Sequence, residues 1–238
     1  VQLTYAYYQN GNKNIDSAEK ELFFSLSKAY DLYNNLLALV VAVTKEARRR
    51  MEVLQNRAKR EGTPAPSQKF TLNRFALQLE ENKMLSEFIG TQKRTWDDHP
   101  EFVSKLLDVI ERSDIYTEYM ESAEDNYDAD REFWRKTYRT LIQKNVELDL
   151  LLEEISLYWN DDKEIVDTFV LKTFNRFNEQ NGPKQELLPE WDSEEEKDFA
   201  RKLFRSSILN ADEYQRFMSE ASRNWDFSRL AYMDIVIM

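Results

Sequence analysis

The feature that most constrains the fold is a run of apolar positions between residues 22 and 44, repeated at spacings of three and four. The run consists of Leu22, Leu26, Ala29, Tyr30, Tyr33, Leu36, Leu37, Val40, Val41 and Thr44. Residues at these spacings lie on one face of an α-helix, so the pattern predicts a sustained amphipathic helix. Asp16 or Ser17 can cap its start, because their side-chain oxygens accept hydrogen bonds from first-turn N–H groups. We therefore expect one long helix that ends near Lys59.

Turn-forming residues are scarce, with four glycines and five prolines among 238 residues. An all-β chain of this size needs many more of them, because its tight turns depend on their special backbone angles. The sequence therefore predicts an all-α fold. Its two clearest breaks are EGTPAPSQ at 61–68 and the glycine- and proline-containing stretch 179–189.

The remaining segments are predicted to form a series of helices. The expected ranges are 1–10, 71–88, 101–122, 131–145, 146–159, a helix that opens at Asp161 and Asp162, 194–209, 211–224 and 228–238. The segment VELDLLLEEISLYW (146–159) is apolar on nearly every side, so we expect it to be the central, surrounded helix. Asp192 or Ser193 is expected to cap the helix that begins at Glu194.

Most catalytic and metal-binding patterns are missing from the sequence. There is no cysteine, which removes disulfides, thiolate nucleophiles and cysteine-based metal sites, and is consistent with the cytoplasmic location that we expect. No Gly-rich phosphate loop and no Gly-x-Ser-x-Gly motif occur. No apolar run reaches the length of about 18 residues that marks a transmembrane helix. We expect no enzyme, no cofactor and no membrane partner.

Two weak metal signals have structural explanations. His99 is the single histidine and is expected to act as a loop cap. NYDADREFWRKT, which begins at Asn126, has the alternating acids of a calcium loop, but Arg131 and Thr137 replace its characteristic glycine and glutamate. The segment is therefore expected to be a helix N-cap, and no metal site is predicted.

Asp149 and Glu153 lie one helical turn apart in the most apolar segment, so they share a face. Acids in apolar surroundings can have raised pKa values and act in acid–base catalysis. Helices also place their few charges on the one exposed stripe, and this is the commoner origin of such a pair. We expect the exposed stripe here.

A basic cluster stands out in a chain whose formal net charge is −11. KEARRRMEVLQNRAKR (45–60) holds seven Lys and Arg residues against two Glu residues, a local charge of +5. Cations are favourable near a helix C-terminus, so a solvated helix end explains the cluster. The alternative is a phosphate-binding patch, with Arg48 and Arg49 as candidate RNA contacts; its affinity would fall with rising salt.

Both ends of the chain carry a more specific pattern. VQLTYAYYQ resembles the first helix of the NusB family of transcription antitermination factors, in which a hydrophobic–Gln–Ala–Leu–Tyr core is typical. Val1, Gln2, Leu3 and Tyr5 match this pattern and Thr4 departs from it.

The C-terminal segment resembles the central helices of the same family. The matching residues, in order, are Asp198 with Phe199, Trp225, Arg229 with Leu230, and Asp234. Trp225, Arg229 and Leu230 are expected to be structural. The two matching segments together cover roughly 55 residues.

The resemblance implies an all-α, NusB-like helical bundle that recognises RNA without catalysis. Proteins of this family bind the boxA segment of ribosomal RNA leader transcripts together with NusE, a ribosomal protein, and join the antitermination complex on RNA polymerase. Carried over by position, Gln2 and Tyr5 are expected to face RNA, and Asp234 is a candidate contact for the protein partner. A buried first helix could equally use Tyr5 as core and Gln2 as surface.

The chain also departs from the family pattern. Residues 12–190 have no counterpart in short members, so we expect three regions: 1–11 as a first helix, 12–190 as a helical insertion, and 191–238 as central helices. The family's Arg-rich segment and later helices are not in this sequence, and the chain reads as the interior of a longer protein.

Two other binding functions remain open from the sequence, and a helical hydrolase that acts through Asp149 and Glu153 comes last. In one, residues 12–190 form a protein–protein scaffold with no RNA role, and their acidic surface docks a basic partner. In the other, the chain is the NusB-like domain that is attached to some RNA methyltransferases.

Overall fold

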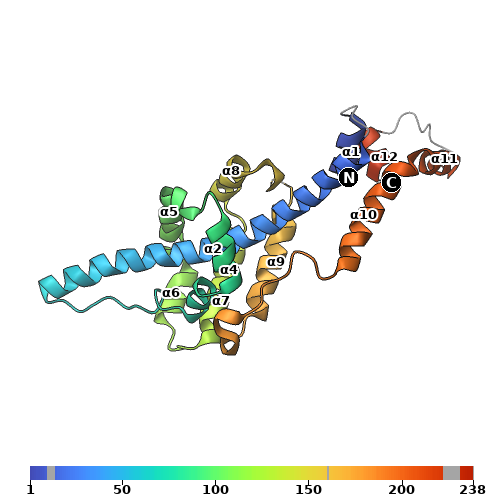
Figure 1. Cartoon of the computed structure of the whole chain (residues 1–238). Coiled ribbons are helices and arrows are strands. Elements are labelled where there is room, and N and C mark those ends of the chain that lie inside the picture. The colour runs from blue at the N-terminus through green and yellow to red at the C-terminus, as the bar shows by residue number, and fades with distance from the viewer. Residues whose placement is uncertain (10–13, 160, 222–230, 238) are drawn as a thin grey trace. The chain divides into compact units, whose positions relative to one another are not determined.

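The computed structural model describes residues 1–9, 14–159, 161–221 and 231–237. Every regular element among these residues is a helix, which confirms the predicted all-α class. The chain divides into two compact units (Figure 1). Unit 1 comprises Val1–Ser27 and Pro189–Met238, and unit 2 comprises Lys28–Leu188. The insertion expected at 12–190 thus differs from unit 2 mainly at its start, because α2 contributes its first turns to unit 1.

The long helix α2 runs from Ile15 to Glu61, as the apolar periodicity predicts. Its first turn is capped by Asn14, whose side-chain oxygen accepts hydrogen bonds from the backbone N–H groups of Asp16 (3.0 Å) and Ser17 (3.1 Å). The cap therefore lies two or three residues before the positions that we expected. Gly62, with a φ of 68°, directly follows the helix.

The middle of α2 is the central element of unit 2. Its fully buried side chains are Leu32, Leu36, Leu37, Leu39, Val40 and Val43. Asn34, Ala38 and Val41 are also buried and extend this set around most of the helix, so neighbouring helices surround it. In Figure 1, α5 and α8 lie above this stretch and α6 and α7 below it.

The prediction that residues 146–159 form the central helix is wrong. The helix α8 spans only Val146–Ile155 and buries Leu148 and Leu152, which are one turn apart. Val146 and Leu150 are exposed instead. Residues 35–44 of α2 contain no charge, whereas α8 carries four acids that need solvent, and this decides which helix is surrounded.

The other helices of unit 2 are short. They are α3 (Arg74–Glu80), α4 (Lys83–Thr91), α5 (Pro100–Glu111), α6 (Asp114–Glu121), α7 (Tyr127–Thr137), α8 (Val146–Ile155) and α9 (Lys163–Arg176). A π-helical turn spans Tyr138–Ile142, and 3₁₀ turns span Trp96–Asp98, Leu157–Trp159 and Glu179–Lys184.

Internal caps split two of the predicted helices. Asn82 divides the helix predicted at 71–88. Its side-chain oxygen accepts a hydrogen bond from the N–H of Leu85 at 3.1 Å, and its amide donates to the carbonyl of Gln185 at 2.7 Å. Ser113 divides the helix predicted at 101–122, because its hydroxyl accepts a hydrogen bond from the N–H of Tyr116 at 3.2 Å. Asn and Ser favour such positions because their side chains replace a missing backbone partner.

Three aromatic side chains tie α2 to its neighbours in unit 2. The indole N–H groups of Trp96 and Trp159 donate to backbone carbonyls of α2 at 2.8 and 2.7 Å. The hydroxyl of Tyr33 lies 2.6 Å from that of Thr173 in α9 and accepts from the N–H of Leu188. Burial raises the pKa of Tyr33 to about 12, so it stays a neutral hydrogen-bonding group at physiological pH.

Asp130 holds the start of α3 against α7. Its buried carboxylate accepts from the hydroxyl of Tyr119 at 2.6 Å and from the backbone N–H of Arg74 at 2.8 Å. Burial raises the pKa of Asp130, and these two hydrogen bonds offset the increase only in part. The folded protein therefore takes up a proton on Asp130 at a higher pH than the unfolded chain does.

This shift predicts a pH dependence of stability. An acid whose pKa is raised by folding costs stability when it ionises, and this cost disappears as pH falls through the folded pKa. The free energy of unfolding of the wild type, minus that of Asp130→Asn, should therefore rise between neutral pH and about pH 4. Urea unfolding of both proteins at a series of pH values measures this difference. A difference that falls with decreasing pH would show that the pKa of Asp130 is lowered instead.

Unit 1 brings together segments from both ends of the chain. Its helices are α1 (Gln2–Gln9), the first turns of α2, α10 (Glu194–Leu209), α11 (Ala211–Ala221) and α12 (Tyr232–Ile237). Ser193 caps α10, as predicted, by accepting from the N–H of Glu196 at 3.2 Å. The guanidinium groups of Arg201 and Arg205 bind the carboxylate of Glu19 at 2.9 and 2.7 Å. These ion pairs fasten α10 to the beginning of α2.

Candidate functional sites

The first candidate site is α1, which carries the family-like residues Gln2 and Tyr5. Gln2 is exposed and Tyr5 is half-buried. The opposite side of the helix packs inward: Thr4 is the buried residue of α1, and the hydroxyl of Tyr8 donates to the carbonyl of Ile208 in α10 at 3.2 Å. Gln2, Tyr5 and Gln9 follow one another at spacings of three and four, so they share the outer face.

Asp234, the predicted partner contact, is exposed in the first turn of α12. Helix α1 contacts both α10 and α12, so Asp234 belongs to the same helix cluster as Gln2 and Tyr5. Trp225, Arg229 and Leu230 lie outside the described residues.

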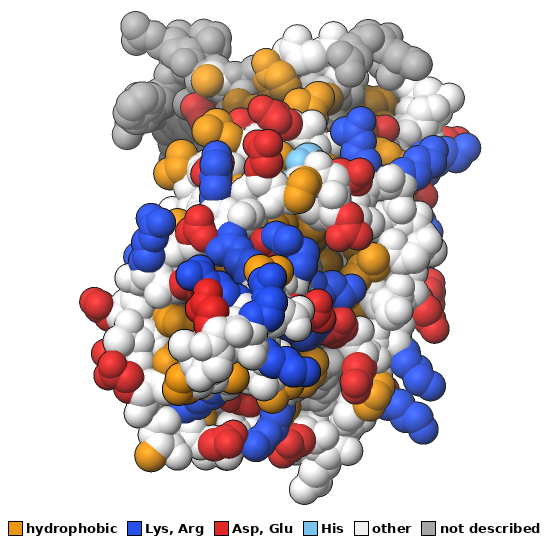
Figure 2. All heavy atoms as spheres, turned by 90° about the vertical axis from the view of Figure 1, so that its left-hand side faces the viewer, with side chains coloured by type: hydrophobic (Ala, Val, Ile, Leu, Met, Phe, Trp, Pro, Cys, Tyr) orange, Lys and Arg blue, Asp and Glu red, His pale blue; other side chains and the backbone are white. Residues whose placement is uncertain are grey.

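The second candidate site is the basic segment of α2. Figure 2 looks onto the face toward which the C-terminal end of α2 points, and shows Lys and Arg side chains gathered there among Asp and Glu. Arg48 forms an ion pair with Glu80 of α3, and Arg49 binds both carboxylate oxygens of Glu46 at 2.7 and 2.8 Å. These two predicted RNA contacts are therefore engaged within unit 2.

Arg50 joins α2 to α5. Its guanidinium donates to Asp108 at 2.6 Å and to both the carbonyl (2.9 Å) and the hydroxyl (2.6 Å) of Ser104. Partial burial alone would lower the pKa of Arg50, but hydrogen bonds to Asp108 and Glu46 outweigh it and raise the pKa. Arg50 stays charged and acts as a structural clamp.

The cations closer to the end of α2 are more exposed. Arg57 pairs with Glu61 one turn later at 2.8 Å, an exposed pair that contributes little to stability. Lys59 and Arg60 are exposed, and neither forms an ion pair with any described residue. This final turn is the part of the basic segment that is most open to an anion.

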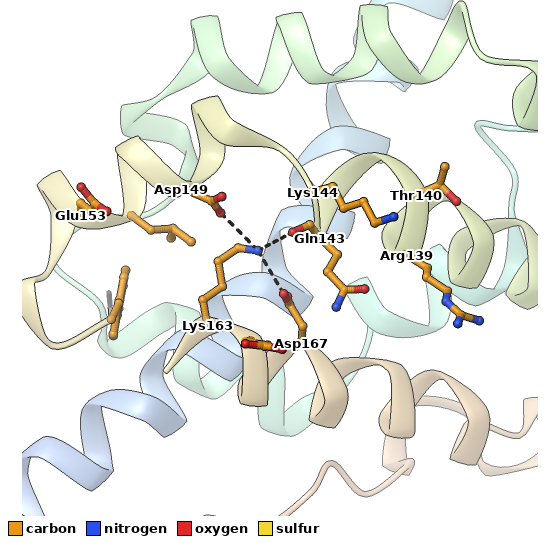
Figure 3. A pocket seen from close by; sticks show the side chains of 11 residues that line it. Arg139, Thr140, Gln143, Lys144, Asp149, Glu153, Lys163 and Asp167 are labelled. Atoms are coloured by element: carbon orange, nitrogen blue, oxygen red, sulfur yellow. Dashed lines mark hydrogen bonds and ion pairs between the residues drawn. The ribbon is translucent and has the colours of Figure 1, made fainter. Parts of the chain in front are cut away.

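The third candidate site is a pocket of about 720 Å³ between the π-helical turn, α8 and α9 (Figure 3). The ammonium group of Lys163 lies in its wall and donates to the carbonyl of Gln143 at 2.9 Å and to Asp167 at 3.0 Å. A second acid, Asp149, lies 3.3 Å from the same nitrogen. Figure 3 shows Arg139 and Lys144 at one end of the pocket and Glu153 at the other.

A buried hydrogen bond completes this arrangement. The hydroxyl of Tyr138, which is fully buried in the π-helical turn, donates to Asp167 at 2.6 Å. Burial raises the pKa of Asp167, while Tyr138 and Lys163 counteract the increase. The Lys163 ammonium donates two hydrogen bonds and also forms the ion pair with Asp149, so this lysine links α8, α9 and the segment that contains Gln143.

Asp149 and Glu153 have different environments in the folded chain. Asp149 binds Lys163, and Glu153 is exposed at the rim of the pocket. Lys163, Asp167 and Tyr138 were not predicted from the sequence as members of this site. The spacing of four between Lys163 and Asp167 was a visible signal of an ion pair, but its connection to Tyr138 exists only in the folded chain.

The described residues hold no group of three or more His, Cys, Asp or Glu side chains that could bind a metal ion. Asn126 is the N-cap of α7 and accepts from the N–H of Ala129 at 2.9 Å, which confirms the capping role of the calcium-like segment. His99 occupies the N-cap position of α5, although its side chain makes no capping hydrogen bond. None of the described helices has both the length and the apolar character that crossing a membrane requires.

The chain matches no family model, no curated protein and no solved structure.

Proposed function

We propose that the protein is a NusB-like antitermination factor that binds boxA-type RNA together with NusE. The observation that supports the proposal is that unit 1 is formed by the two ends of the chain. The two segments that resemble the family are separated by more than 170 residues, yet α1 packs against α10 and α12. The NusB-like bundle would then be unit 1, with unit 2 inserted between its first and central helices.

The outer face of α1 offers suitable groups for single-stranded RNA. Sequence-specific proteins bind unpaired bases by stacking them on aromatic side chains and by hydrogen bonding to their edges. The Tyr5 ring supplies a stacking surface, and the amide of Gln2 both donates and accepts hydrogen bonds. Asp234 on α12 would contact NusE. This division separates RNA contact and protein contact onto two helices of one unit.

Fluorescence anisotropy with a labelled boxA-type RNA tests the proposal. We expect the chain to bind this RNA more tightly than an RNA of the same composition in permuted order, and NusE to strengthen binding. Tyr5→Ala should weaken binding about tenfold, because stacking on one aromatic ring contributes about 1–3 kcal/mol per base. Tyr5→Phe keeps the ring and should bind normally.

Phe217→Ala is a matched control, since Phe217 is an exposed aromatic residue of unit 1 on α11. Equal affinity for the two RNAs, with or without NusE, would refute the proposal. Equal weakening by Tyr5→Ala and Phe217→Ala would refute the assignment of RNA contact to α1.

The second candidate function is a protein–protein scaffold, and the ion pairs of α2 favour it for unit 2. Arg48 and Arg49 are bound to Glu80 and Glu46, so an RNA phosphate would have to compete with these carboxylates. RNA contact by Arg48 and Arg49 therefore stays a prediction.

A further inference from the structure

Helix α8 exposes apolar side chains on the surface of unit 2. Val146 is 70% exposed, Leu150 57%, and Leu157, just after the helix, 84%. Val146 and Leu150 lie one turn apart and form an exposed apolar stripe on α8, and Leu157 lies in the 3₁₀ turn that follows the helix. Leu148 and Leu152, on the opposite side, already anchor α8 to the core, so the exposed stripe is not needed to hold the helix in place. Large apolar side chains that neighbour one another on the surface and are not needed for folding are typical of an interaction site.

Acidic side chains border this stripe. Glu147, Glu153 and Glu154 are all exposed on α8. Glu147 forms an exposed ion pair with Lys105 at 2.9 Å, whereas Glu153 and Glu154 form no ion pair with any described residue. Glu164, exposed at the start of α9, adds another carboxylate. The stripe therefore combines apolar side chains with negative charge.

The pocket beside α8 gives the surface a concave edge. Its wall on this side contains Leu152, Glu153, Trp159 and Glu164 (Figure 3). Lys163 keeps the wall in place, since its ammonium group links α8, α9 and the carbonyl of Gln143. A preformed edge lowers the entropic cost of binding.

We propose that the exposed side of α8, with the adjoining acidic wall of the pocket, docks a basic amphipathic helix of a partner protein. The partner's apolar residues would cover Leu150 and Leu157, and its Lys or Arg residues would reach Glu153 and Glu164. An amphipathic helix fits this surface because its apolar and charged positions recur at the same spacings. The proposal does not depend on RNA binding by unit 1, and it defines a binding surface for the scaffold function.

Charge argues against the other occupants. In a symmetric dimer through α8, Glu153 and Glu154 of one copy would face the same acids of the other, and like charges oppose such a contact. Nucleic acid and anionic lipid carry the same sign of charge as this surface. A cationic, partly apolar segment is the one partner that satisfies both the stripe and its border.

The test uses a fluorescent synthetic peptide of about 18 residues, five helical turns of leucine and lysine arranged as an amphipathic helix. A peptide of the same composition, in an order that forms no apolar face, is the control. We expect the wild-type chain to bind the first peptide more tightly. Leu150→Glu and Glu153→Lys should each weaken binding about tenfold, as for a central interface residue. Both positions are exposed, so neither change should disturb folding, and circular dichroism checks this.

Leu54→Glu is the matched control variant, because Leu54 is an exposed apolar residue on α2, away from α8. Its peptide affinity should equal that of the wild type. Equal binding of the two peptides, no binding at all, or an equal loss in Leu54→Glu would overturn the proposal. Sedimentation analysis tests whether a second copy of the chain occupies this surface. A wild-type dimer that dissociates in Leu150→Glu would assign the surface to a second copy. RNA affinity measured on the same variants should not change, so this result is separate from the test of RNA binding.

Discussion

Replacing Asp167 by alanine is expected to lower the free energy of unfolding by about 3–5 kcal/mol, the cost of removing one partner from a buried ion pair. Asp167 is 2% exposed and accepts from both Tyr138 and Lys163. The variant would leave the Tyr138 hydroxyl buried with no acceptor among the described residues. Lys163 would keep only Asp149 and the carbonyl of Gln143.

Urea unfolding, followed by circular dichroism at neutral pH, measures this loss. Glu164→Ala is the control on the same helix, and its exposed side chain should change stability by no more than about 0.5 kcal/mol. Asp167→Asn should fall between the two, because its single amide oxygen can replace only one of the two carboxylate acceptors. If Asp167→Ala were as stable as Glu164→Ala, the buried link between Tyr138, Asp167 and Lys163 would not exist.

Replacing Trp134 by alanine should cost about 3–5 kcal/mol, because it removes a fully buried indole and leaves a cavity. The Trp134 ring packs against Phe70 and Phe133, with ring centroids 5.8 and 5.6 Å away. These rings join α7 to the segment before α3, and the loss of the indole removes contacts on both sides.

A second variant separates packing from hydrogen bonding at this position. The indole N–H of Trp134 is buried and has no acceptor among the described residues. An unsatisfied buried donor costs about 1–3 kcal/mol, so Trp134→Phe should lose far less stability than Trp134→Ala. Thermal and urea unfolding of the two variants compare them directly. Equal losses would show that the indole N–H has a partner, or that the site does not collapse around phenylalanine.

Much of the helical architecture could be predicted from local pattern. The range of α2 followed from its apolar spacing, and Ser193 was recognisable as a cap from the acids that follow it. The splits at Asn82 and Ser113 were missed, although both residues are typical caps, because the apolar periodicity continues across them. A cap inside a periodic run competes with helix continuation, and tertiary contacts such as Asn82 with Gln185 decide the outcome.

The apolar content of a segment did not predict which helix the other helices surround. The segment 146–159 has few polar residues, yet its four acids keep one side of α8 in solvent. The ion pairs of the basic segment could also be predicted only in part. Arg49 and Glu46 are close in sequence and their pairing was visible, whereas Glu80 is 32 residues from Arg48 and their ion pair depends on the fold.

We propose that unit 1 recognises RNA through the outer face of α1. Ultraviolet cross-linking to a boxA-type RNA, followed by mass spectrometric mapping of the adducts, tests it most directly, because aromatic side chains stacked on bases react efficiently. Adducts on residues 2–9, with Tyr5 as the main site, are the predicted result, and they should disappear with the permuted RNA. Adducts confined to residues 28–188, or the same adducts with both RNAs, would contradict the account.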